Sequence, residues 1–288
     1  MDSPEIVVTT TYNAGSRTLW IIIALTIALL IIFGIAIWVF FAFFNPPAMH
    51  EIIVNNNCSH NINVLFGAVT TNQSIEFFPV IKLSPKQTHL YKATPGTSII
   101  VQGYKDNDMI LINNVNPFTT AELTLAGQGF VGKHQVTNGN IIITDLHITA
   151  NSTDKYGISL QGGYNIPISI SVHHNSNNPS CPSAGSWNHL ITATGPNSCP
   201  EELQSPGTGA NYQVCLNPCT MIGGTAYCCT QSGACSTTGG CEQLWPELDY
   251  YTVFANACPT CLITNCDDPH FTCTSTRDLT SYSINFCP

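Results

Sequence analysis

The stretch CPTCLITNCDDPHFTC, residues Cys258–Cys273, decides how this chain folds, because it places four cysteines within sixteen residues. Thirteen of the fourteen cysteines lie between Cys181 and Cys287, and only Cys58 lies upstream. Cysteines at such density form disulfides that staple a loop-rich fold, and disulfides require an oxidising compartment. Zinc-binding or free thiols are the alternative, but tandem pairs at zinc spacing are lacking. The lone CxxC pattern is more typical of structural bridges than of a redox centre.

Residues Leu19–Phe44 form a second decisive stretch, LWIIIALTIALLIIFGIAIWVFFAFF, which contains no charged side chain. A helix needs about 20 apolar residues to cross the hydrocarbon of a bilayer, so this run can span it with some tilt. It is too long for the core of a signal peptide, and Asn45-Pro46-Pro47 ends it abruptly. We predict a transmembrane helix at 19–44 that binds the lipid bilayer, after a tail at 1–18 and before an ectodomain at 45–288.

Arg17 lies just before the apolar run, and no Lys or Arg follows the run until Lys82. Because basic residues flank the cytoplasmic end of a membrane helix, this bias predicts a cytoplasmic or interior N-terminus. The disulfide argument agrees, since it requires an oxidising space for the C-terminal domain. We expect a single-pass membrane protein whose ectodomain is extracellular, luminal or on the exterior of a virion.

The ectodomain carries 7 Lys and Arg residues against 15 Asp and Glu residues. Nucleic acid is excluded as a partner class because phosphate contacts require a basic surface. Charged residues make up only 9% of the chain, so Asn, Thr, Ser and Gln must build most of the surface, which suits a secreted β protein.

Short β-branched runs separated by turns predict an all-β fold for the first part of the ectodomain. The runs are Glu51–Asn55, Asn61–Phe66, Ser98–Gln102, Ile141–Asp145 and Ile168–Val172. Strands at this spacing favour a β-sandwich. After Val172 only Pro246–Ala257 has a helical pattern, and Ser281–Phe286 is strand-like again. We predict a β core at about residues 51–172 plus 281–287, and a disulfide-rich loop region at about residues 173–280.

Several segments, in order along the ectodomain, resemble those of thaumatin-like proteins. In the C-terminal half they are Gly163-Tyr-Asn-Ile-Pro167, Cys199-Pro-Glu-Glu-Leu203, Tyr227-Cys228-Cys229, Cys258-Pro259, Asp267-Asp-Pro-His-Phe-Thr-Cys273 and Tyr282-Ser-Ile-Asn-Phe-Cys-Pro288. In the N-terminal half they are weaker: Val54-Asn-Asn-Asn-Cys58, Leu83-Ser-Pro85, Pro95-Gly96 and Thr120-Ala-Glu-Leu-Thr-Leu125. The resemblance implies a thaumatin-like sandwich of about 11 strands with a disulfide-rich loop region packed beside it.

The same resemblance implies disulfide pairs. These are Cys58 with Cys287, Cys181 with Cys258, Cys199 with Cys215, Cys219 with Cys228, and Cys229 with Cys241 or Cys235. Closing the long first loop stabilises the fold by roughly 4–5 kcal/mol on chain-entropy grounds. The family's usual partner of Cys273 is missing, and Cys235, Cys261 and Cys266 are additional to the family pattern, so each of these three is a candidate replacement.

Many antifungal and glucan-cleaving members of the family line a cleft with an Arg, a Glu and three Asp residues. Glu122 matches the family's Glu, but two of the Asp positions fall on Gly157 and Gly162, and the cleft Arg has no counterpart. Asp154 lies near Gly157 but out of register. Glycoside hydrolysis needs two carboxyl groups, one as acid and one as base or nucleophile. The sequence therefore predicts no catalytic residue, a solvated or structural Glu122, and a wide, nearly neutral groove.

The remaining candidate sites are weaker. His173-His174 could bind a metal, but adjacent residues of a strand point to opposite faces, so we expect no metal site and no cofactor. Asn57, Asn72 and Asn151 begin N-x-Ser/Thr sequons and are candidate glycosylation sites if the domain crosses the secretory pathway. Such triplets also arise by chance in a chain rich in Asn, Ser and Thr.

Three functions remain open at this point. The favoured one is a membrane-anchored, non-catalytic thaumatin-like module with a structural or partner-binding role at a cell or virion membrane surface, in contact with protein neighbours or glycan. The second is a protein that binds β-glucan or another polysaccharide. The third is a glucan-hydrolysing defence-type protein, against which the missing carboxylates count.

Overall fold

The structure is a computed structural model. It describes residues 14–44, 49–69, 75–105, 119–125, 127–137, 140–151, 153–173, 181–184, 199–205, 214–229, 248–267, 271–274 and 281–288. The chain divides into two compact units, residues 1–47 and residues 48–288. The first unit contains α1 (Ala14–Phe44), which begins five residues before the predicted apolar run. Its window Trp20–Ile37 is long and apolar enough to cross a membrane, a test that a signal sequence near the N-terminus also passes.

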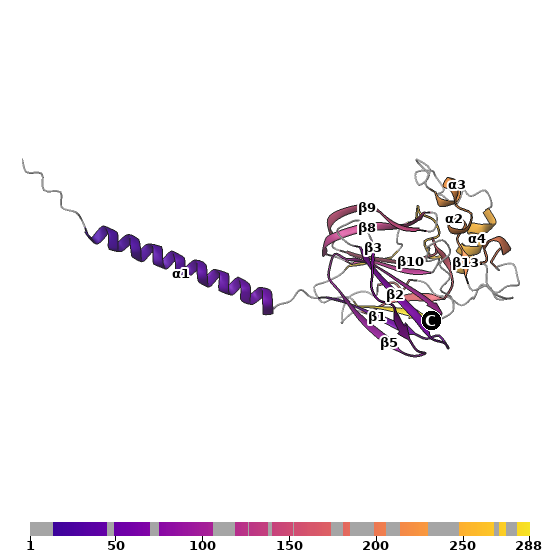
Figure 1. The fold of residues 1–288 in the computed structure, drawn as a ribbon, viewed down its shortest axis with the longest axis horizontal. Helices are drawn as coiled ribbons and strands as arrows, with labels where there is room; N and C mark the ends of the chain where they lie inside the picture. Colours follow the sequence, from indigo (N-terminus) through magenta and orange to yellow (C-terminus); the bar gives the residue numbers. More distant parts are fainter. Residues whose placement is uncertain are drawn as a thin grey trace, which may run out of the picture. The chain divides into compact units, whose positions relative to one another are not determined.

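The second unit is built on two β-sheets (Figure 1). Sheet A has four strands in the order β12 (Ile168–His173), β15 (Ser281–Phe286), β1 (His50–Asn56) and β5 (Thr88–Ala93). Sheet B has seven strands, in the order β14 (Phe271–Thr274), β10 (Thr153–Ser159), β7 (Thr120–Thr124), β6 (Ser98–Lys105), β2 (Ile62–Val69) and β3 (Ile75–Phe77), with β4 (Ile81–Leu83) also paired to β2. A hairpin of β8 (Gly127–Thr137) and β9 (Asn140–Asn151) and a small pair of β11 (Gly163–Tyr164) and β13 (Cys215–Leu216) complete the strands of the described part.

Burial along the strands shows which faces of the two sheets are covered. In β1 every second residue is buried, the pattern of a strand with one face on the core. In β6 all residues from Ser98 to Tyr104 are buried, so this central strand of sheet B is covered on both faces. Sheet A thus presents one face outward, whereas the middle of sheet B is enclosed.

The core lies between the sheets and is made of inward-facing side chains from both. Sheet A contributes Ile52, Val54, Tyr282, Ile284 and Phe286, and sheet B contributes Val64, Phe66, Val101, Leu123, Tyr156 and Ile158. Burying each such side chain stabilises the fold by roughly 1.5–3 kcal/mol. The ring of Phe286 lies on Gly103 of β6, where an added Cβ would meet the ring at 2.4 Å. A strand glycine here permits the close approach of the two sheets.

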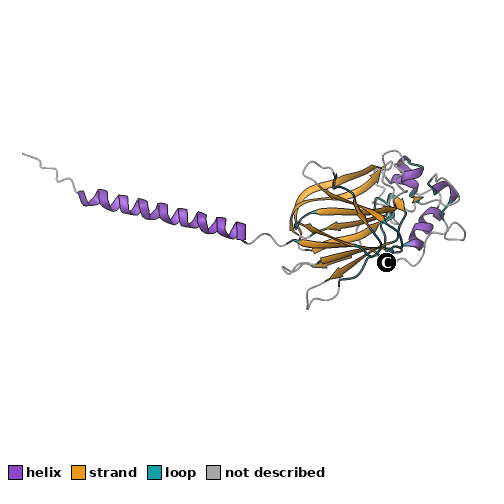
Figure 2. Ribbon diagram, turned by 60° about the horizontal axis from the view of Figure 1, so that its bottom comes forward, coloured by secondary structure: helices purple, strands orange, loops and turns teal. Residues whose placement is uncertain are grey.

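Short helices gather on one side of the strands (Figure 2). They are η1 (Glu201–Leu203), α2 (Pro218–Met221), α3 (Gly224–Cys228) and α4 (Leu248–Ala257). Asn217 caps α2: its side chain accepts from the Cys219 N–H, and Pro218 occupies the first helical turn. The range 173–280, expected to consist of loops, also supplies β14 to sheet B, because Asp154–Tyr156 of β10 pair with Phe271–Cys273.

The bridges follow the expected pairing in part. Cys58–Cys287, Cys199–Cys215 and Cys219–Cys228 are the pairs that the resemblance implies. The implied pair Cys181–Cys258 is wrong: Cys181 bonds Cys273, and Cys258 bonds Cys261. None of the three additional cysteines therefore replaces the partner of Cys273. Proximity explains why Cys258 bonds Cys261 and not Cys181. The two residues lie in one turn, in which the Cys261 N–H donates to the Cys258 carbonyl at 3.1 Å.

Two further cysteines, Cys229 and Cys266, are also disulfide-bonded. The expected pairing of Cys229 with Cys241 or Cys235 lies outside the described residues.

Candidate functional site

Glu122 lies on the face of sheet B that points away from sheet A. It stands in β7 between Ile100 of β6 and Gly157 of β10, each directly opposite it in register. Its chain neighbours Ala121 and Leu123 point into the core, so alternation along the strand directs Glu122 to the other face. We define the floor as four buried polar residues of this face that lie at and beside Glu122: Gln102, Thr120, Glu122 and Ser159.

The floor is buried and largely neutral. Gln102 is 1% exposed and Glu122 is 9% exposed. Tyr104, two residues along β6 from Gln102, packs with Val214 and Leu216 of the disulfide-rich region, which covers this end of the face. Gly157 and Gly162, the two positions expected to open the groove, are themselves buried.

One amide of the floor is only half satisfied. Gln102 Nε2 donates to Thr120 Oγ1 at 2.8 Å. Its Oε1 is buried and has no hydrogen-bond partner among the described groups. A buried acceptor without a donor is costly, so this amide lowers the stability that the floor would otherwise contribute. Asn165 ties the neighbouring loop to the sheet by donating to the Gly103 carbonyl at 2.7 Å and accepting from the Thr119 N–H at 3.1 Å.

Asp154, the out-of-register carboxylate, does not join Glu122. It lies in β10 on the same side as Tyr156, within the sandwich, whereas Glu122 lies on the opposite face of sheet B. Asp154 is fully buried and therefore cannot reach a sugar bound over the floor. Asp145 belongs to β9, and its side chain is outside the described part of the structure.

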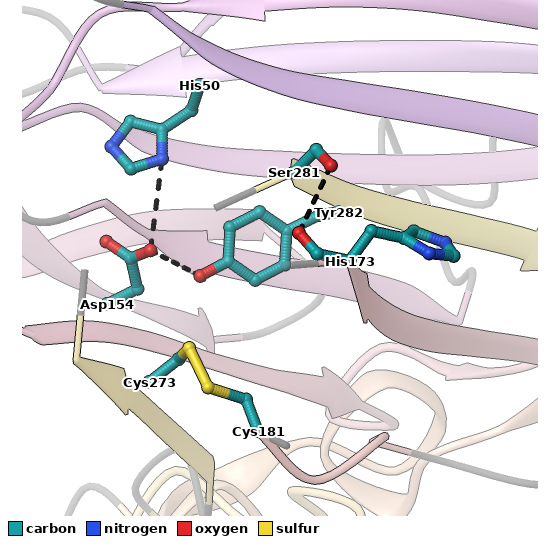
Figure 3. A network of polar contacts seen from close by, with 7 residues as sticks. All are labelled: His50, Asp154, His173, Cys181, Cys273, Ser281 and Tyr282. Carbon is teal, nitrogen blue, oxygen red and sulfur yellow. Dashed lines mark hydrogen bonds and ion pairs between the residues drawn. A yellow bond between two sulfur atoms is a disulfide. The ribbon is translucent and has the colours of Figure 1, made fainter. Parts of the chain in front are cut away.

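Asp154 is instead the centre of a buried polar cluster, which Figure 3 shows from close by. The Tyr282 hydroxyl donates to Asp154 Oδ2, and Nδ1 of His50 lies 3.8 Å from the same oxygen. Nearby Tyr156 donates its hydroxyl to the Pro182 carbonyl. Burial and, to a smaller extent, the Asp154 charge raise the pKa of Tyr156 to about 12. The cluster joins β1, β10 and β15, so its role is to tie the two sheets together.

Reasoning from the sequence missed this cluster, although a signal was present. Asp154 precedes Tyr156 and Ile158 at alternating positions of one strand, so all three must share a face. A carboxylate in register with two core residues is buried and needs donors. His50 could not be matched to it without the topology, because 104 residues separate them along the sequence.

The remaining candidate residues from the sequence are the two adjacent histidines and the three sequon asparagines. His173 Nε2 and Ser283 Oγ are 2.8 Å apart, and His174 lies outside the described residues. Asn57 is exposed, whereas the side chains of Asn72 and Asn151 are not described. No group of three or more His, Cys, Asp or Glu side chains that could hold a metal occurs in the described ranges.

The two-sheet architecture and the bridge between the first and the last strand agree with the thaumatin-like fold that the sequence resembles. A profile described as Thaumatin family matches residues 124–288, more than half of the chain. The chain belongs to the thaumatin family. The matched range begins at the end of β7, yet β1 and β15 pair directly, so the N-terminal strands are integral to the same fold.

Several named proteins are similar to about half of this chain. Thaumatin-like protein 1 of Castanea sativa is 34% identical over 149 residues, covering 51% of this chain and 55% of that protein. Osmotin-like protein of Nicotiana tabacum is 35% identical over 139 residues, covering 48% and 46%. Glucan endo-1,3-beta-glucosidase of Prunus avium is 32% identical over 140 residues, covering 47% and 49%. The chain thus spans about half the length of these relatives.

Among solved structures, that of the thaumatin-like xylanase inhibitor TLXI is similar at 13% identity, with 82% of this chain and 99% of that chain covered. The TM-score is 0.33, so the likeness carries no weight for function.

Proposed function

We propose that this protein is a membrane-anchored, non-catalytic thaumatin-like module with a structural or partner-binding role at a cell or virion membrane surface. The observation that carries the non-catalytic part is the floor: Glu122 faces Gly157 in register, and Asp154 lies inside the sandwich. Retaining and inverting glycosidases alike need two carboxyl groups roughly 5–10 Å apart across the scissile bond. Glu122 alone cannot supply both roles.

The apolar helix supports the membrane part of the proposal. Large side chains along it are exposed, among them Trp20 at 68% and Leu29 at 66%, and none of its membrane-length window is buried. Leaving such a surface in water is costly, whereas hydrocarbon accommodates it. The bridges of the ectodomain and the position of Arg17 support an N-terminus inside and an ectodomain on the oxidising side.

Membrane association and topology are tested on the full chain in its native membranes. The anchor predicts that alkaline carbonate leaves the protein in the pellet, as it does integral membrane proteins. Protease added to the outside of sealed vesicles or virions should digest the ectodomain and spare residues 1–18. Release by carbonate would contradict the anchor, and protection of the ectodomain would contradict the orientation.

Catalysis is tested by release of reducing sugar from β-1,3-glucan. We expect none from the parent chain, and no difference between the parent and Glu122→Gln. Activity that disappears in Glu122→Gln would mean that another acid, such as Asp145, completes a catalytic pair.

Binding of β-glucan or another polysaccharide is the second candidate function. It is supported by Glu122, which matches the family's cleft Glu and keeps 9% of its surface exposed, and by one relative, from Prunus avium, that is named as a glucan endo-1,3-beta-glucosidase. Co-sedimentation with insoluble β-1,3-glucan tests it. If the face around Glu122 binds glucan, Glu122→Gln should lower retention while Glu51→Gln, a half-exposed carboxylate on β1 of the other sheet, leaves it unchanged.

Glycosylation belongs to the same proposal. Asn57 is the sequon asparagine whose side chain is described and exposed, so an ectodomain made in the secretory pathway should carry glycan there. Enzymatic removal of N-glycan should shift the parent chain on a gel, and the shift should be smaller in Asn57→Gln.

A further inference from the structure

Strand β1 connects the membrane helix to the sandwich. Only residues 45–49 lie between the end of α1 and His50, the first residue of β1. Within sheet A, β1 lies between two partners: it pairs with β15 in parallel and with β5 in antiparallel orientation. The strand nearest the anchor is therefore an interior strand, hydrogen-bonded along both sides.

The far end of β1 is joined covalently to the far end of the chain. Cys58 follows β1 and bonds Cys287, which follows β15, across a sequence separation of 229. Because β1 and β15 are parallel, both strands run toward this bridge. Pro288 follows the bridge directly. The covalent route from His50 to Pro288 is thus one extended strand and one disulfide.

Polar contacts hold this end of β1 in place. Asn55 Nδ2 donates to Asn285 Oδ1 at 2.8 Å, and the Asn57 N–H donates to the Phe286 carbonyl at 3.0 Å. Asn56 is fully buried and donates to the carbonyls of His60 and Leu83, both at 2.9 Å. A β-strand is already near its full length, at about 3.3 Å per residue, so the route offers almost no slack.

We infer that the ectodomain is built to bear tension between its membrane anchor and its C-terminal end, because that tension runs through β1 and the Cys58–Cys287 bridge and bypasses the rest of the fold. The inference rests on the proposed membrane anchoring. The intact bridge fixes the ends of the parallel strands β1 and β15 to each other, so the pull would shear their ladder only once the bridge is cleaved. The residues between Cys58 and Cys287 form a closed loop outside the route, and they stay folded under load.

Single-molecule force spectroscopy on the full chain in a supported bilayer tests the inference, with a handle on Pro288. We expect the anchor to leave the bilayer without prior unfolding of the ectodomain. Adding a phosphine reductant while the chain is held under force should cleave the bridge. The freed loop should then lengthen the tether by on the order of 800 Å, the extended length of about 229 residues.

A matched variant separates this bridge from the others. Cys199→Ser with Cys215→Ser removes a bridge outside the route and should leave the parent trace unchanged before reduction. Cys58→Ser with Cys287→Ser should lengthen without reductant, and reduction of the parent gives the same information if that variant fails to fold. A long extension from the oxidised parent would overturn the inference. Failure to form any bilayer tether would overturn the anchoring and, with it, the inference.

Discussion

The sandwich and the disulfide-rich region of this protein are stabilised in different ways. Between the sheets, strands of up to eight residues bury rows of aliphatic and aromatic side chains. In the disulfide-rich region most elements are short: apart from α4 with ten residues, β13 has two residues, α2 has four and α3 has five. Elements of that length bury too little surface to stabilise themselves, so bridges and single buried polar side chains hold them.

Both regions contain a buried asparagine that caps the backbone next to a bridged cysteine. Asn56 and Asn217 each lie two residues before a bridged cysteine and accept its N–H, at 2.9 and 3.0 Å. Asn217 Nδ2 also donates to the carbonyls of Leu160 and Ile263, at 3.1 and 2.9 Å. In each place a buried amide satisfies backbone groups that have no ladder partner. The comparison suggests that bridges join the segments while buried amides fix their conformation.

The largest effect should come from the bridge that unites the sandwich. Cys58→Ser with Cys287→Ser should lower the free energy of unfolding by about 4–5 kcal/mol, because the bridge closes a very long loop. Cys258→Ser with Cys261→Ser should lower it by only about 2 kcal/mol, because that loop spans three positions. Urea denaturation followed by circular dichroism measures both. Equal losses would contradict the chain-entropy explanation.

The next largest loss of stability should come from removing the side-chain amide of Asn217 or Asn56. Asn217→Ala leaves two carbonyls and one N–H without their partner and should cost about 3 kcal/mol. Asn56→Ala should cost a similar amount in the sandwich, since it removes three equivalent bonds. Asn57→Ala, at an exposed neighbour, is the control and should have little effect. Loss of stability in Asn56→Ala alone would show that the disulfides suffice in the second region.

A smaller effect should follow from crowding the two sheets. Gly103→Ala places a methyl group against the Phe286 ring and should cost about 2 kcal/mol, because overpacked cores must shift. Gly34→Ala in α1 is the matched control, since its Cβ would meet nothing within 4 Å. Thermal unfolding of the two variants measures the difference. An unchanged melting temperature in Gly103→Ala would mean that the sheets separate more easily than their packing indicates.

The smallest effect on stability should come from the ionisation of Tyr156, and it should appear only at high pH. Burial raises the pKa of Tyr156 to about 12, so the folded state prefers the protonated phenol. The resulting stability is present below the ordinary tyrosine pKa of about 10 and is lost as the pH rises toward the folded value. Tyr156→Phe should remove the share of the loss of folding stability at high pH that comes from this phenol, while it keeps the packing of the ring. Absorbance of tyrosinate against pH measures it, and ionisation of Tyr156 near pH 10 in folded protein would contradict the prediction.

Much of the fold could be predicted from the sequence because its signals are local. The alternation in Ile168–Val172 and the β-branched runs at Glu51–Asn55 and Ser98–Gln102 all became strands. The candidate site was predicted less well. The sequence identified Glu122 but left it as solvated or structural, because its burial depends on segments far along the chain that cover the floor.

The sequence by itself determined what composition and short-range pattern encode. These are an apolar segment long enough for a bilayer, a mostly β fold for residues 48–288 and a bridged C-terminal region. The resemblance carried by the sequence implied three of the bridges correctly, but only the tertiary structure decided the partners of Cys181, Cys258 and Cys273, because pairing depends on distance in space. Cys181 found Cys273 across 92 positions, while Cys258 bonded a neighbour three positions away. The same reason explains the cluster of His50, Asp154 and Tyr282, since three strands had to assemble before those side chains could meet.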